Sequence, residues 1–60
     1  MKNIRGKNLI QFLLDLPEGY TLYLGSDQIG DLALIDNFKW YSMDINEETK
    51  EVHIAEGLLL

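Results

Sequence analysis

Apolar positions recur with helical spacing near the start of the chain. Leu9, Leu13 and Leu16 lie three or four residues apart, which indicates one face of a helix. Asn8 is placed to cap the first turn, and Pro17 disfavours helical geometry at the residue before it. The pattern therefore predicts a short amphipathic helix from Asn8 to Leu16. Such a helix is too short to be stable alone in water, so it must dock on other elements.

Four later stretches carry residues that favour strands. In the first of them, Leu22 and Leu24 alternate with outward-facing residues and would point toward the helix. Residues 25–30 have glycine at both ends, which is typical of a loop. The expected strands are 20–24, 32–35, 39–45 and 50–55. This order predicts a single domain, 1–60, of the α+β class: one N-terminal amphipathic helix packed on a three- to four-stranded antiparallel sheet.

The last two expected strands can be aligned by requiring their apolar residues to share one face. A four-residue loop, 46–49, satisfies this requirement, and Asn46 suits the first position of a type I turn. The alignment sets Ile45 opposite Lys50, Met43 opposite Val52, and Tyr41 opposite Ile54. It also sets Asp44 opposite Glu51, a like-charge pair that we expect to be tolerated on an exposed face.

The apolar faces of these elements predict one hydrophobic core between helix and sheet. Its expected members are Leu9, Ile10, Leu13, Leu14, Leu16, Leu22, Leu24, Leu32, Leu34, Met43, Ile45, Val52 and Ile54. The stretch 58–60 consists of three leucines, which are costly to leave in water. We expect it to pack over the edge of the core or to join a subunit contact.

Three aromatic side chains do not fit on the face that carries this core. Tyr23, Phe38 and Trp40 alternate away from the core, and one helix can cover only one face of the sheet. Exposed aromatic patches mark protein contacts, because each ring removes a large apolar area from water when it is covered. A bulge near Trp40, or cover from residues 1–4, would instead return the rings to the interior. An acidic rim is expected around the patch, formed by Asp27, Asp31, Asp36, Asp44 and Glu51.

The distribution of charged residues limits the kinds of partner that the chain can bind. The chain of 60 residues has ten acids against five bases, and three of the bases fall within the first seven residues. The rest of the chain is therefore strongly acidic and repels phosphate backbones, which argues against direct nucleic-acid binding. A basic protein surface is the complementary partner. A domain this small often relies on a partner subunit, and without cysteine it has no disulfide, so two options stay open: a well-packed monomer or a homo-oligomer.

No motif for catalysis, cofactor or metal binding stands out. Residues 27–31 partly resemble an acidic calcium loop, but the alternating ligands and the final glutamate of such loops are missing. His53 falls on the outward side of its strand without a cysteine or serine partner, and we expect a plain surface histidine. The apolar stretch 9–16 is short and carries Gln11 and Asp15, so we expect neither a secretory signal nor a membrane span. The sequence predicts a protein that is not an enzyme and binds no cofactor.

The stretch from Lys7 to Leu24 resembles the start of small uncharacterised phage and mobile-element proteins. In those proteins a helix that ends in Leu-Pro-acid, here Leu16-Pro17-Glu18, leads into a first strand. The resemblance implies a bacterial or phage origin and a cytoplasmic location, and it carries no active-site residue. Small acidic phage proteins include inhibitors of host defence, such as anti-CRISPR proteins.

These observations predict a non-enzymatic, acidic protein-binding module, with a phage-encoded inhibitor of a host protein as its biological setting. Two alternatives stay open. One is a structural homodimer whose aromatics and leucines complete an undersized core. The other is an acidic mimic of nucleic acid that occupies a basic groove of its target.

Overall fold

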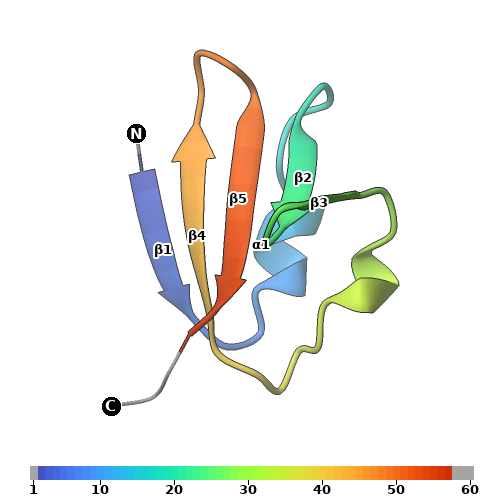
Figure 1. The fold of residues 1–60 in the computed structure, drawn as a ribbon, viewed down its shortest axis with the longest axis vertical. Helices are drawn as coiled ribbons and strands as arrows, with labels where there is room; N and C mark the ends of the chain where they lie inside the picture. The colour runs from blue at the N-terminus through green and yellow to red at the C-terminus, as the bar shows by residue number, and fades with distance from the viewer. Residues whose placement is uncertain (1, 58–60) are drawn as a thin grey trace.

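The computed structural model describes residues 2–57, which form one sheet of five strands (Figure 1). The strands are β1 (Lys2–Gly6), β2 (Thr21–Leu24), β3 (Asp27–Ile29), β4 (Tyr41–Asn46) and β5 (Glu51–Glu56). One short helix, α1 (Ile10–Leu14), and one 3-10 turn, η1 (Leu32–Leu34), complete the described elements.

The sheet is mixed, with the strand order β1-β4-β5-β2-β3. Neighbouring strands are antiparallel except β2 and β5, which run parallel. β1 and β2 therefore point the same way, and the hairpin of β4 and β5 is inserted between them (Figure 1). Both halves of the chain are needed to build the sheet, because each central strand pairs with one strand from the first 24 residues.

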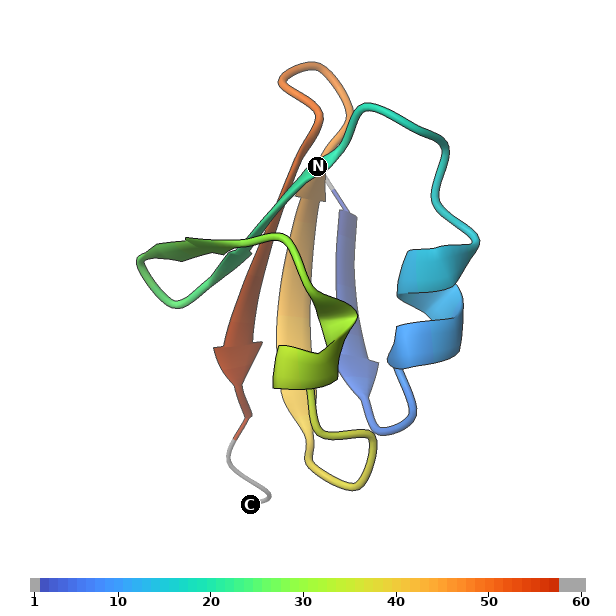
Figure 2. The ribbon, with the colours of Figure 1, turned by 90° about the vertical axis from the view of Figure 1, so that its right-hand side faces the viewer.

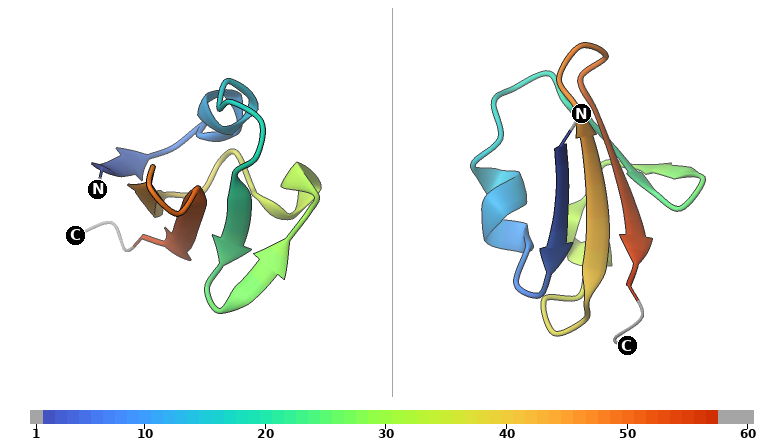
Figure 3. Two further views of the ribbon diagram at one scale, coloured as in Figure 1. Left: turned by 90° about the horizontal axis from the view of Figure 1, so that it is seen from above. Right: turned by 90° about the vertical axis from the view of Figure 1, so that its left-hand side faces the viewer.

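α1 and η1 lie on the same side of the sheet (Figures 2 and 3). On this side, Met43 of β4 and Val52 and Ile54 of β5 are almost fully buried, and Leu13 of α1 joins them. Burying side chains of this kind contributes roughly 1.5–3 kcal/mol each. The other buried members of the core are Leu9, Ile29, Ile35, Tyr41 and Ile45. Within residues 2–57 no element covers the opposite side, which we call the open face (Figure 3).

The predicted fold class was wrong. The domain is made mostly of strands, five in a mixed sheet, and is not a helix packed on a small antiparallel sheet. α1 is only five residues long, and Asn8, at φ 58, does not cap its first turn. Residues 2–6, which precede the predicted helix, form the edge strand β1 and pair with β4.

The middle of the chain was also predicted wrongly. Gly25, at φ 64, begins a two-residue turn between the paired residues Leu24 and Asp27, so the predicted loop contains β3. The predicted strand 32–35 is instead η1, because the side chain of Asp31 accepts a hydrogen bond from the backbone N–H of Ala33 at 2.9 Å. This cap favours a tight turn over an extended strand.

The β4–β5 hairpin has the predicted parity but a register shifted by two residues. Its loop is 47–50, with Lys50 at φ 60. The pairs are Ile45 with Val52, Met43 with Ile54, Tyr41 with Glu56, and Asp44 with His53. The side chain of Asn46 accepts hydrogen bonds from the backbone N–H groups of Glu48 and Thr49, which fixes this loop. The inward-facing residues are therefore those predicted, and the unfavourable pair of Asp44 with Glu51 does not form.

The predicted core needs two corrections. Leu14 and Leu34 are exposed, at 61% and 59%, whereas Ile29 and Ile35 are buried without having been predicted. The leucines of residues 58–60, for which we expected packing or a subunit contact, lie outside the described residues. No helix among residues 2–57 is long and apolar enough to cross a membrane.

Candidate protein-contact site

The open face carries several polar side chains that interact with one another. Asn3 of β1 donates hydrogen bonds to Ser42 Oγ at 3.1 Å and to Asp44 Oδ1 at 2.7 Å, both on β4. The ring of Tyr23 lies here too, stacked on His53 with 4.7 Å between the ring centroids and 6° between the planes. The open face thus holds one of the three rings predicted for it, already stacked against a neighbouring strand.

Glu51 also lies on the open face, near the loop of the hairpin. Its Oε1 accepts a hydrogen bond from Thr49 Oγ1 at 3.4 Å and lies 3.3 Å from Nε2 of His53. Glu51 and Asp44 are therefore engaged with neighbours on the sheet. They do not form a rim around an exposed aromatic patch.

Phe38 lies elsewhere, in the loop that leads from η1 to β4. With 85% of its surface exposed, it is far more open than the exposed leucines. Leu34, at the end of η1, is the nearest exposed apolar residue along the chain. Leu34 and Phe38 are thus two exposed apolar residues of the segment 34–39, which we call the Phe38 loop.

Hydrogen bonds hold the Phe38 loop in one conformation. The side chain of Asp36 accepts a bond from the backbone N–H of Phe38 at 2.8 Å, and the carbonyl of Asp36 accepts one from Lys39 at 3.1 Å. The N–H of Asp36 donates to the hydroxyl of Tyr41 at 3.0 Å, and the ring of Tyr41 is only 3% exposed. The exposed ring of Phe38 is therefore carried by a loop that is tied into the core.

The start of α1 supports the same loop from the other side. Asn37 accepts two hydrogen bonds there, one from the N–H of Asn8 at 3.1 Å and one from the N–H of Ile10 at 3.4 Å. Trp40, by contrast, is half-buried next to β5, where its carbonyl accepts a bond from Gly57 at 2.8 Å. The structure thus separates Phe38, Trp40 and Tyr23 into three places.

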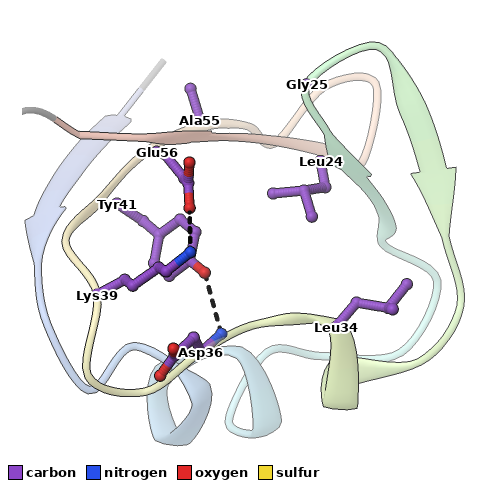
Figure 4. Close-up of a pocket in the computed structure, with 8 residues that line it drawn as sticks. All are labelled: Leu24, Gly25, Leu34, Asp36, Lys39, Tyr41, Ala55 and Glu56. Atoms are coloured by element: carbon purple, nitrogen blue, oxygen red, sulfur yellow. Dashed lines mark hydrogen bonds and ion pairs between the residues drawn. The ribbon is translucent and has the colours of Figure 1, made fainter.

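A hollow of about 380 Å³ opens beside the Phe38 loop, between η1 and the ends of β2 and β5 (Figure 4). Its lining consists of Leu24, Gly25, Leu34, Asp36, Lys39, Tyr41, Ala55 and Glu56. The ammonium of Lys39 lies 2.8 Å from Glu56 Oε1 within this lining. The hydrogen bond from Lys39 to Glu56, together with the negative charge of Glu56, raises the pKa of Lys39 above its ordinary value.

Of the acidic residues predicted for the rim, one lines this hollow and another is paired with a lining residue. Asp36 lines it, Asp27 lies across from the lining residue Leu24, and Asp31 caps η1. Lys39 is the only base in the lining, and Glu56 already pairs with it. The region is therefore acidic overall, with an apolar side and a charged side.

Sequence reasoning placed Leu34 in the core and did not single out Lys39 or Glu56. The sequence did contain a signal for a folded loop in this region, namely the positions of Asp31 and Asp36. Asp31 and Asp36 each bind the backbone N–H two residues further on, which is the Asx-turn pattern. Two such turns around residues 32–38 would have replaced the predicted strand by a folded loop.

No family model, curated protein or solved structure matches this chain. Among residues 2–57 there is also no group of three or more histidine, cysteine or acidic side chains that could hold a metal ion. We take the Phe38 loop and the hollow next to it as the candidate site, because of the exposure of Phe38 and the lining of the hollow.

Proposed function

We propose that this chain is a non-enzymatic protein-binding module of the cytoplasm and that it contacts its partner through the Phe38 loop and the adjacent hollow. The observation that carries the proposal is the exposure of Phe38, 85%, on a loop whose backbone is tied to Tyr41 and α1. This surface replaces the open face as the proposed contact, because the open face carries polar groups that already bind one another.

The energetics favour this surface as a binding site. Covering an exposed aromatic or aliphatic side chain stabilises a complex by roughly 1.5–3 kcal/mol. Ordering a mobile side chain on binding costs about 0.5–1.5 kcal/mol, and a loop that is already ordered avoids part of this cost. Phe38 and Leu34 therefore have the properties of an anchor: they are exposed and apolar, and the backbone that carries them is fixed in advance.

The charges around the loop indicate the kind of partner. Asp36 lines the hollow, Asp27 lies across from the lining residue Leu24, and the whole chain carries a net charge of −5. A partner with a basic surface would be attracted to this side and oriented by it. The proposal includes the phage-encoded inhibitor that the start of the chain suggested, since the target of such an inhibitor is a host protein.

Site-specific photocrosslinking in bacterial cytoplasm tests the proposal. We would place benzoylphenylalanine at position 38 and, as a matched control, at position 14, where Leu14 is also an exposed apolar residue but lies on α1. We expect a discrete adduct from position 38 that Leu34→Ser abolishes, and no such adduct from position 14. Absence of an adduct from position 38 contradicts the proposal, and an adduct between two copies of the chain supports the homodimer instead.

A further inference from the structure

We infer that the hollow beside the Phe38 loop accepts a basic side chain of the partner protein, and that arginine fits it better than lysine. The inference rests on the proposed function, because it takes the occupant from a partner protein, and it adds the chemistry that the partner must present. It is argued from the shape of the hollow and from the charges that line it.

The lining divides into an apolar side and a charged side. The side chains of Leu24 and Leu34 border one side, and the pair of Lys39 and Glu56 lies at the other (Figure 4). An arginine or lysine side chain has the same division, since its methylene stem packs on apolar surface while its charged head stays near water or carboxylates. A purely apolar side chain would leave the charged side of the hollow unused.

The balance of charge selects a cation over an anion. The lining contains two carboxylates, Asp36 and Glu56, against the single ammonium of Lys39. Asp27 adds a further negative charge across from Leu24. The ammonium is already paired with Glu56 at 2.8 Å, so an incoming anion would meet an uncompensated negative field.

Guanidinium chemistry suits the carboxylate of Glu56 in particular. Only Oε1 of Glu56 accepts a hydrogen bond within residues 2–57, so Oε2 is available to a second donor. A guanidinium presents several N–H groups in one plane and can bind a carboxylate through two of them. The ion pair is exposed, so Lys39 can move aside without losing its contact with water.

The test is a two-dimensional NMR titration of the whole chain with acetyl-Gly-Arg-Gly-amide. The matched probe is the same peptide with citrulline, which has nearly the shape of arginine and no charge. We expect saturable shifts confined to residues 24–25, 34–41 and 55–56. We expect the citrulline peptide to bind at least about two- to fivefold more weakly, the range that one exposed ion pair supports.

Two charge variants make the test more specific, because they should change the affinity for the arginine peptide in opposite directions. Glu56→Gln should weaken binding of the arginine peptide about two- to fivefold, and Lys39→Met should strengthen it by a similar factor. Glu48→Gln is the control, since it makes the same charge change in the hairpin loop at the other end of β5 (Figure 1). It should leave the affinity nearly unchanged.

Three results would overturn the inference: shifts spread over the acidic surface, equal binding of the two peptides, or equal effects of Glu56→Gln and Glu48→Gln. The crosslinking at position 38 reports separately on the proposed function. A captured partner with no basic residue at the contact refutes the basic occupant alone. Peptide binding in the hollow without a crosslinked partner refutes the proposed function alone.

Discussion

The hydroxyl of Tyr41 connects the exposed Phe38 loop to the core, and its removal is the most informative perturbation. Tyr41→Phe keeps a ring that is 3% exposed and removes only the acceptor for the N–H of Asp36, which lies at 3.0 Å. A buried donor left without an acceptor costs about 1–3 kcal/mol. Because Asp36 itself is an exposed residue, we expect the lower end, a loss of about 1 kcal/mol in the free energy of unfolding.

The loss is measurable because the domain is small. A change of about 1 kcal/mol shifts the Tm of a domain of this size by roughly 4–8 °C. Urea unfolding can be followed through the fluorescence of Trp40, the single tryptophan. Amide hydrogen exchange should also become faster at Asp36 and Phe38, because the loop opens more often when its link to Tyr41 is absent. Binding through Phe38 should weaken in parallel, since the loop must then be ordered on contact.

Tyr23→Phe is the control for this experiment. The ring of Tyr23 stacks on His53 on the open face, and within residues 2–57 its hydroxyl has no hydrogen bond. We expect a change within about 0.5 kcal/mol, as for other surface substitutions. Equal losses in the two variants, or unchanged exchange at Asp36, would show that the hydroxyl of Tyr41 does not hold the loop.

Further substitutions test the packing of the core and the ion pair. Met43→Ala opens a cavity at a fully buried position and should lower the free energy of unfolding by about 2–5 kcal/mol, enough to unfold much of so small a domain. Leu14→Ala, at an exposed position, should lower it by less than about 0.5 kcal/mol. Urea unfolding followed by circular dichroism measures both values, and similar losses would place Leu14 in the core. Folding raises the pKa of Lys39, so its pairing with Glu56 stabilises the fold fully below the ordinary lysine pKa and loses this contribution as the pH rises through the raised value. The Tm advantage of the unmodified chain over Lys39→Met should therefore be constant near neutral pH and shrink as the pH rises above the ordinary lysine pKa of 10.5. An advantage that grows above this pH would contradict the assignment.

Most of the correct predictions about the fold came from the alternation of apolar and polar residues along the strands. Met43 and Ile45 on β4, and Val52 and Ile54 on β5, face the core as expected, because a shift of two residues in register leaves every side chain on the same face. The register itself depended on the loop, where Lys50 adopts a positive φ that its residue type does not indicate.

The parts of the fold that were predicted wrongly depend on contacts between residues far apart in the sequence. β1 contains a single apolar side chain directed inward, Ile4, and it becomes a strand because Met43 lies opposite. The parallel pairing of β2 with β5 joins Leu22 to Val52 and has no local signature. The hairpin around Gly25 did have a signature, since Gly-Ser is a known two-residue turn between paired strands.

The candidate site was predictable only in part. Phe38 is exposed as expected, but alternation placed it on the open face of the sheet, whereas it lies on a loop. The hollow was not predictable, because Leu24, Lys39 and Glu56 come from three separate segments that meet only after the sheet has formed. Leu34 was assigned to the core because the apolar stretch 32–35 was predicted to be a strand with Leu32 and Leu34 facing inward.

The insertion of β4 and β5 between β1 and β2 has a consequence for biosynthesis. While the ribosome has made only the first forty residues, β1 has nothing to pair with, and β2 has only the short strand β3. Sheets that depend on contacts between distant residues form slowly, and their unpaired edges associate with other chains during the delay. The nascent chain should therefore stay unfolded until residues 41–56 emerge, and then acquire its sheet in one cooperative step.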